Sequence, residues 1–153
     1  MSGPPRPREN PAYQAFLALV RVAALLFKAG DRFFRPHGLT QVQFNVLMAL
    51  KHGAPEGRTQ TELGRHLVVK DANMSALVRR MLARGLIRRA DDPADTRAWR
   101  VTLAPQGRDL LRVAGPGYGR ALESLMGGCS PRDARRFADM LRQAEGAAKR
   151  LGL

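Results

Sequence analysis

The chain has 153 residues, of which 26 are Lys or Arg and 13 are Asp or Glu, so its formal net charge is +13. This length suits one ordinary domain with its own core, and the charge favours a polyanionic partner, with a merely solvated basic surface as the alternative. The single cysteine, Cys129, excludes an internal disulfide framework and a cysteine-based metal site.

The N-terminal part reads as an arm followed by a long helix. Residues 1–9 are rich in Pro and Arg and are predicted to be a disordered basic arm. Asn10-Pro11 is typical of an N-cap with Pro at the first helical position, and Pro36 ends a helix predicted to run to about Phe34. One broad face of this helix carries its apolar residues: Phe16, Leu19, Val20, Ala23, Leu26 and Phe27.

The apolar run of this helix bears on the location of the protein. Phe16 to Phe27 is only about half of the roughly 20 residues that span a membrane, and Arg21 interrupts it. We therefore expect no membrane partner and a cytoplasmic protein.

A second helix begins with a capping box, in which the Thr40 hydroxyl and the Gln43 amide satisfy each other's backbone donors. This helix is predicted to end near Gly53. Its inward residues are expected to be Phe44, Leu47, Met48 and Leu50.

The centre of the chain predicts a helix-turn-helix. Thr59 to Glu62 forms another capping box, and the short helix that it opens ends in a turn at Val68-Val69. The next helix, up to a C-terminal Gly85, has an apolar back made of Met74, Leu77, Val78, Met81 and Leu82. In such a motif the second helix can enter the major groove of DNA.

Two strands are predicted after this motif, at residues 86–90 and 98–103. In the second, Trp99, Val101 and Leu103 alternate with polar or small residues. The polar turn between the strands, residues 91–97, is expected to lie outside the core. A helix-turn-helix followed by a hairpin tipped by Arg is a winged helix.

The C-terminal part predicts two more helices. Pro105 suits the first turn of one helix, but three glycines and a proline in residues 115–119 should kink or interrupt it. The last helix starts at Ser130-Pro131, with an apolar stripe made of Phe137, Met140, Leu141, Ala144, Ala148 and Leu151. The first and last helices need cover, which a second copy of the chain would supply; packing within a monomer is the alternative.

Together these motifs resemble the MarR family of transcriptional regulators. The resemblance runs without a gap from about residue 39 to 111, and its specific part is the Asp-x-Arg wing that follows Gly-Leu-Ile-x-Arg. The matching residues are Leu39-Thr40-x-x-Gln43-Phe44-x-Val46-Leu47, Thr59-x-x-Glu62-Leu63, Val69 to Arg89 with Ser75 and Gly85-Leu86-Ile87-x-Arg89, Asp92-Pro93-x-Asp95-x-Arg97-Ala98, and Leu103-x-x-x-Gly107-Arg108.

The resemblance implies a mainly α-helical fold with a small β-hairpin wing. Residues 10–38 would form an N-terminal dimerisation helix, residues 39–103 the winged helix-turn-helix, and residues 104–153 the C-terminal helices of the dimerisation region. The expected function is that of a homodimeric, sequence-specific repressor on a pseudo-palindromic operator in double-stranded DNA. A sequence-tolerant architectural DNA-binding protein is the alternative, followed by a protein-interaction module.

The DNA contacts are expected from three places. Phosphates suit the helix N-terminus at Thr59, Gln60 and Thr61, where capping alone is the other reading. Base edges and flanking phosphates suit the exposed side of the second helix, through Lys70, Asn73, Ser75, Ala76, Arg79 and Arg80. Because Lys70 replaces the small capping residue usual there, Asp71 is the alternative N-cap.

The wing supplies the third set. The resemblance makes Arg97 the residue that enters the minor groove, with Asp95 either orienting a neighbouring Arg or capping its own turn. Three further arginines are expected to add positive charge to the wing and so to add salt-sensitive affinity for DNA: Arg88, Arg89 and Arg100.

The sequence favours a binding protein over an enzyme. His37, His52 and His66 are too scattered for a zinc motif, and we expect no cofactor and no metal. Cys129 is interpreted as a small loop residue rather than a redox sensor. The resemblance implies a small anionic, commonly phenolic effector in a cleft between the dimer helices and the winged helix, for which Arg21, His37 and Trp99 are conceivable lining residues.

Overall fold

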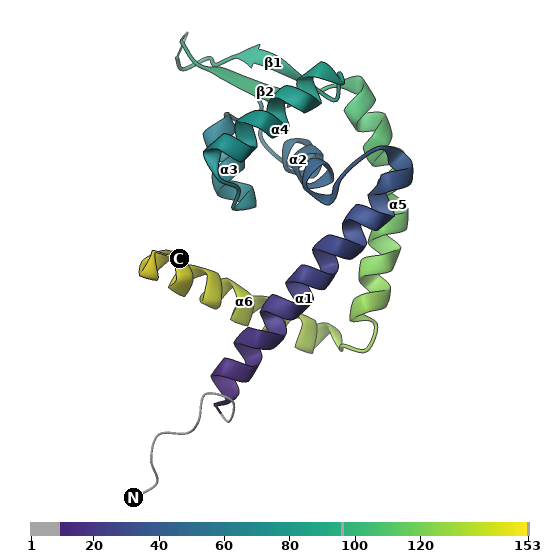
Figure 1. Ribbon diagram of the computed structural model, residues 1–153, viewed down its shortest axis with the longest axis vertical. Helices are drawn as coiled ribbons and strands as arrows, with labels where there is room; N and C mark the ends of the chain where they lie inside the picture. Colours follow the sequence, from purple (N-terminus) through teal and green to yellow (C-terminus); the bar gives the residue numbers. More distant parts are fainter. Residues whose placement is uncertain (1–9, 96, 153) are drawn as a thin grey trace, which may run out of the picture. The chain divides into compact units, whose positions relative to one another are not determined.

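The structure is a computed structural model that describes residues 10–95 and 97–152 (Figure 1). The predicted arm at residues 1–9 lies outside the described residues. Along the described part, the elements are α1 (Pro11–Phe34), a 3-10 turn (Arg35–His37), α2 (Gln41–Lys51), α3 (Gln60–Leu67), α4 (Asp71–Ala83), β1 (Ile87–Asp91), β2 (Trp99–Leu103), α5 (Pro105–Met126) and α6 (Pro131–Leu151).

These elements form two compact units, a first that ends at Ala114 and a second that begins at Gly115. In the first unit α2 packs against α1, α3 and β2, and α4 packs against α3 and β1. The largest fully buried side chains of this unit come from α1, α2, α3, α4, both strands and the residue before β1: Phe34, Val46, Leu47, Leu63, Met74, Val78, Met81, Leu86, Ile87 and Val101. The predicted mainly α fold with a hairpin wing is confirmed.

The helix starts agree with the sequence. The Asn10 side chain accepts from the Ala12 N–H, and both predicted capping boxes are formed, Thr40 with Gln43 and Thr59 with Glu62. In α2 the expected Phe44, Leu47 and Leu50 are buried, together with Val46 and Ala49, whereas Met48 is only half-buried. Leu82, expected on the apolar back of the helix after the turn, is half-buried as well.

The junction between α1 and α2 is tightly built. The Gln41 backbone N–H donates to Asp31 Oδ1 at 2.8 Å, and the buried Gln41 side chain lies against Gly30. A Cβ on Gly30 would overlap the end of that side chain, which would then have to move out of its place between α1 and α2.

The end of α4 leads directly into the wing. Gly85, with φ +67°, donates its N–H to the Leu82 carbonyl at 2.9 Å, and Leu86 donates to Met81 at 3.0 Å. This pair of bonds is a Schellman motif, the predicted glycine stop. Leu86 and Ile87, which follow this motif, are buried in the core. Ile87 begins an antiparallel hairpin, in which it pairs with Leu103 and Asp91 pairs with Trp99.

Of the two predicted outcomes for α5, the interruption is wrong, since the helix runs from Pro105 through Pro116 to Met126, and a kink stays a prediction. Pro116 lacks the N–H that would donate to the Arg112 carbonyl, and its ring crowds that carbonyl, but Leu111 and Ala114 are buried and anchor the preceding turns in the core. Glycine lowers helix propensity by about 1 kcal/mol per residue, which tertiary packing can offset.

Both terminal helices carry large apolar side chains that the single chain leaves exposed. On α1 they include Phe16, Leu17, Leu25 and Phe27, with exposed fractions of 47–58%. On α6 they are Phe137, Met140 and Leu151. The helical stretch Pro11–His37 is also long and apolar enough to cross a membrane by length and composition, so the sequence argument that its apolar run is too short is wrong.

Candidate nucleic-acid interface

The turn between α3 and α4 depends on two residues at the end of α3. Val68 adopts a left-handed conformation with φ 54° and ψ 46°, and the Val69 N–H donates to the Gly64 carbonyl at 2.9 Å. A Cβ on Gly64 would lie 3.0 Å from the Val69 carbonyl oxygen, so a residue without a side chain suits this close passage. The turn brings α4 alongside α3 (Figure 1).

Helix α4 has two chemically different sides. Met74, Leu77, Val78 and Met81 are at most 5% exposed and hold the helix on the core. The opposite side carries the residues that the sequence assigned to DNA: Asn73, Ser75, Arg79 and Arg80 are exposed, Ala76 is half-buried, and Lys70 is exposed at the start of the helix. A stable apolar back therefore presents a polar and basic front.

The first turn of α4 settles the capping question. Lys70 is the N-cap, with extended backbone angles and no side-chain capping bond, and Asp71 is the first helical residue. The alternative in which Asp71 is the N-cap is therefore wrong. Asp71 still suits the first turn, because a carboxylate interacts favourably with the positive end of the helix dipole.

At the start of α3, capping uses the Thr59 side chain. Its Oγ1 accepts from the Glu62 N–H at 3.2 Å, and the Thr59 N–H donates to Glu62 Oε2 at 2.8 Å. The Gln60 Oε1 atom is buried and has no hydrogen-bond partner among the described residues, while Thr61 is exposed.

The wing turn differs from the expectation at Asp92. This residue is 7% exposed and lies inside, although the whole turn was expected outside the core. Asp92 Oδ1 accepts from the Ala94 N–H at 3.0 Å, and Oδ2 accepts from Arg100 Nε at 2.9 Å. The Ala94 N–H, and secondarily the Arg100 guanidinium, hold the pKa of the Asp92 carboxyl below its ordinary value.

Asp95 and Arg97 both lie exposed in the same turn. Asp95 Oδ1 accepts from the Arg97 backbone N–H at 2.9 Å, which is the turn-capping role left open by the sequence. Within the described residues of the wing, the carboxylate that holds an Arg side chain is that of Asp92, not Asp95.

Arg100 is a structural residue rather than part of an open basic field. Besides Asp92, its guanidinium contacts the Gly57 carbonyl at 3.1 Å and Glu62 Oε2 at 3.3 Å, and its side chain is 18% exposed. The sequence offered one local signal, opposite charges on both sides of the wing turn. Nothing local linked Arg100 to Glu62, which is 38 residues away in the chain.

The other two wing arginines, Arg88 and Arg89, are exposed. The Arg89 guanidinium carbon lies 4.1 Å from the centre of the Trp99 ring, an arrangement typical of a cation–π contact. Trp99, considered above for an effector cleft, therefore lies on the wing under an arginine.

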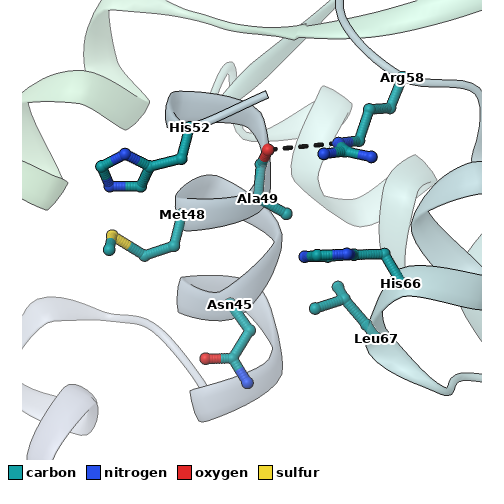
Figure 2. Close-up of a pocket in the computed structure, with 7 residues that line it drawn as sticks. All are labelled: Asn45, Met48, Ala49, His52, Arg58, His66 and Leu67. Carbon is teal, nitrogen blue, oxygen red and sulfur yellow. Dashed lines mark hydrogen bonds between the residues drawn. The ribbon is translucent and has the colours of Figure 1, made fainter. Parts of the chain in front are cut away.

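A pocket of about 340 Å³ lies beside the helix-turn-helix (Figure 2). Its lining comes from the outer side of α2, the loop before α3, and the end of α3: Asn45, Met48, Ala49, His52, Arg58, His66 and Leu67. Arg58 Nε donates to the Ala49 carbonyl at 3.3 Å. Two of the three histidines considered scattered thus line one pocket, and its lining includes no carboxylate. Within the described ranges, no three His, Cys, Asp or Glu residues come together as a metal-binding group.

Comparisons with known proteins agree on this architecture. Residues 37–98 match the sequence model of the MarR family. The transcriptional regulator HosA of Escherichia coli is 31% identical over 105 residues, which cover 69% of this chain and 76% of HosA. The transcriptional activatory protein BadR of Rhodopseudomonas palustris is 33% identical over 103 residues, 67% of this chain, but the match spans only 59% of the length of BadR.

Solved structures extend the match to most of the chain. The transcriptional regulator MOSR of M. tuberculosis, solved in complex with DNA, is 30% identical and has a TM-score of 0.67, covering 87% of this chain and 97% of MOSR. The similarity therefore includes the helices on both sides of the winged helix. On these matches, the chain belongs to the MarR family of winged-helix transcriptional regulators.

Proposed function

We propose that this protein is a sequence-specific DNA-binding repressor that acts as a homodimer. The observation that carries the proposal is the division of α4, whose apolar side is buried while Asn73, Arg79 and Arg80 are exposed. Side chains of these types pair with base edges in the major groove, Asn with adenine and Arg with guanine, each worth about 1–3 kcal/mol of discrimination.

The remaining contacts serve position and affinity. The first turn of α3 offers the backbone N–H groups of Gln60 and Thr61 and the Thr61 hydroxyl to a phosphate, since Thr59 is engaged in its capping box. Lys70, Ser75 and Ala76 line the approach of α4 to DNA. On the wing, exposed Arg97 enters the minor groove and Asp95 shapes the turn that presents it.

Two copies of the chain explain the exposed apolar side chains. Phe16 and Leu25 on α1 are 57% and 58% exposed, and Met140 on α6 is 50% exposed. A partner copy that covers such surfaces removes the cost of leaving them in water, and it places two α4 helices about 34 Å apart, one DNA turn. Membrane insertion of α1 is the less economical explanation, because Lys28, Asp31 and Arg32 follow within the same helix. We place the protein in the cytoplasm, with the DNA.

We further propose a small anionic effector, commonly phenolic, that releases the protein from DNA. A candidate place for it is the pocket beside α2 and α3, where Arg58, His52 and His66 offer donors and Met48 and Leu67 offer apolar surface. The described lining residues of this pocket include none from α1, α5 or α6, so it differs from the cleft that the resemblance implies. The effector must bind the spacing of the free dimer more tightly than the DNA-bound spacing, or it releases nothing.

The decisive experiment is fluorescence anisotropy of the purified protein on its own upstream promoter fragment and on a scrambled duplex, across a salt series. We expect a preference of about a thousandfold for one site, in the range of specific regulators. Arg97→Ala should weaken operator binding. An Arg97→Ala protein with full affinity would contradict the wing assignment, and binding to neither duplex would favour a protein-interaction module.

The salt series also tests the architectural alternative, which the net charge of +13 permits. Equal and steeply salt-dependent affinity for both duplexes would support it. A reporter gene behind the bound promoter then decides between repression and activation, because the name of BadR describes an activator.

A further inference from the structure

The contact between Arg89 and Trp99 is an arrangement that the family resemblance does not account for. In the hairpin Arg89 pairs with Val101 and Asp91 pairs with Trp99, so Arg89 and Trp99 are diagonal neighbours on one face of the two strands. Diagonal positions in a sheet are about 7–8 Å apart at the backbone, which long and aromatic side chains can bridge. The guanidinium carbon accordingly lies 4.1 Å from the ring centre.

The charged groups around this pair leave the guanidinium edges open. Asp91 lies on the same face directly across from Trp99, yet no ion pair joins it to Arg89 among the described residues. The Arg89 N–H groups have no hydrogen-bond acceptor in the described part of the chain. Arg100, by contrast, projects from the other face of β2 and is held by Asp92 and Glu62.

We propose that Trp99 is a positioning residue that holds Arg89 in place for a phosphate of duplex DNA. A guanidinium that stacks by its flat face keeps its N–H donors at the edge, where they match the two oxygens of a phosphate. The indole also restricts the rotamers of a long side chain before DNA arrives, which lowers the entropy cost of the contact. This inference rests on the proposed DNA-binding function and adds a residue to it.

The first test is a double-mutant cycle on the operator fragment. Trp99→Leu should weaken binding roughly two- to fivefold, the range of an exposed cation–π contact, and Trp99→Phe, which keeps an aromatic face, should recover most of it. Arg89→Met should lower the salt slope by about one ion and cost less in the Trp99→Leu background than in the wild type.

Arg88 provides the matched control, since it lies on the opposite face of the same strand, across from Thr102. Arg88→Met should cost the same whether or not Trp99 is present. If Arg89→Met also costs the same in both backgrounds, the positioning role is wrong. Thermal melts of Trp99→Leu and Trp99→Phe show whether loss of stability rather than of position explains a weaker complex.

The second test does not need DNA. Trp99 is the single tryptophan of the chain, so intrinsic fluorescence reports on this site alone. Arg89→Ala should increase quenching by neutral acrylamide in the free protein, because the ring loses its cover, while Arg88→Ala should not. Unchanged quenching in Arg89→Ala would overturn the contact itself. If the wild type binds no duplex but Arg89→Ala still increases the quenching, the contact is correct and the proposed DNA-binding function is wrong.

Discussion

Arg100 Nε donates to Asp92 Oδ2 at 2.9 Å, and the same guanidinium reaches Glu62 Oε2 at 3.3 Å, so one side chain links the wing turn to the first turn of α3. A third bond, to the Gly57 carbonyl at 3.1 Å, includes the loop before α3. The Arg100 side chain is therefore one link between the wing and the helix-turn-helix, beside the two backbone hydrogen bonds that join Arg58 before α3 to Val101 of β2. The relative position of the wing and the helix-turn-helix decides whether α4 and Arg97 can meet adjacent grooves together.

We therefore expect Arg100→Met to lower both stability and operator affinity. Removal of the guanidinium leaves the buried Asp92 carboxylate without its charged partner, which is costly. The melting temperature should fall by several degrees in differential scanning calorimetry. At a temperature where the variant is still folded, operator affinity should fall more than the loss of one phosphate contact explains, because the wing turn loses its side-chain link to the first turn of α3.

The control for this variant is Arg112→Met. Arg112 pairs with Asp109 at 3.5 Å, but both side chains are at least 70% exposed, and such surface pairs contribute little. Its melting temperature should stay close to that of the wild type. If the two substitutions lower the melting temperature equally, the hydrogen bonds of Arg100 contribute no more to stability than a surface ion pair.

The lowered pKa of Asp92 predicts an acid-dependent stability. The pKa of Asp92 is lower in the folded than in the unfolded state. Its carboxylate therefore stabilises the fold at pH values above the ordinary pKa of 3.8, and this contribution is lost as the pH falls through the pKa of the folded state. The free energy of unfolding from urea titrations should therefore differ most between wild type and Asp92→Asn near neutral pH, and the gap should shrink below about pH 4. A gap independent of pH would contradict the ionised pairing with Arg100 and the Ala94 N–H.

Val68 predicts a stabilising substitution. It is a β-branched residue with φ 54° whose side chain is 85% exposed, so its left-handed backbone is not offset by packing. Asn tolerates this conformation, and Val68→Asn should raise the free energy of unfolding by about 1 kcal/mol, the cost of a left-handed residue. Val68→Thr keeps the β-branch and should gain nothing. A gain of the same size in Val68→Thr would show that polarity, and not backbone strain, is responsible.

Two glycines of α5 should respond in opposite ways to Ala. A Cβ on Gly107 would overlap the Leu86 carbonyl oxygen, which accepts from the Ala104 N–H, so Gly107→Ala should destabilise the protein by about 1–3 kcal/mol. Gly119 has no atom within 4 Å of such a Cβ, and Gly119→Ala should stabilise the helix by about 0.5–1 kcal/mol. Chemical denaturation of both variants checks this, and destabilisation by Gly119→Ala would contradict the continuous helix through residues 115–119.

Sequence alone predicted the parts of this fold that depend on neighbouring residues. Both capping boxes, the Gly85 stop and the apolar back of α4 depend on residues within a few positions of each other. The local sequence is therefore enough to predict them. Because the apolar side of α4 was predicted to be buried, the opposite side was predicted to be exposed. The roles of its individual residues toward DNA stay predictions.

The parts that sequence missed depend on partners far apart in the chain. The turn pattern around Asp92 predicts a polar, exposed turn, and only the fold brings Glu62, 38 residues away from Arg100, to the Arg100 side chain that Asp92 holds. The pocket that His52 and His66 share needs α2 and α3 side by side. In α5, glycines and Pro116 predicted a break from local propensity, which is a weak guide where packing of the preceding turns fixes the helix.

The proposed dimerisation through α1 predicts that one charged substitution on the apolar surface of this helix dissociates the dimer. Phe16 is 57% exposed in the single chain, and a carboxylate at this position would have to be buried without a partner in a dimer. In sedimentation velocity the wild type should have about twice the chain mass of 16.9 kDa, while Phe16→Glu should shift to the monomer and lose operator affinity. Lys28→Glu places the same carboxylate at an exposed polar position of α1 and should remain dimeric. A wild type that sediments as a monomer at micromolar concentration would instead mean that the apolar side chains of α1 and α6 are covered in another way.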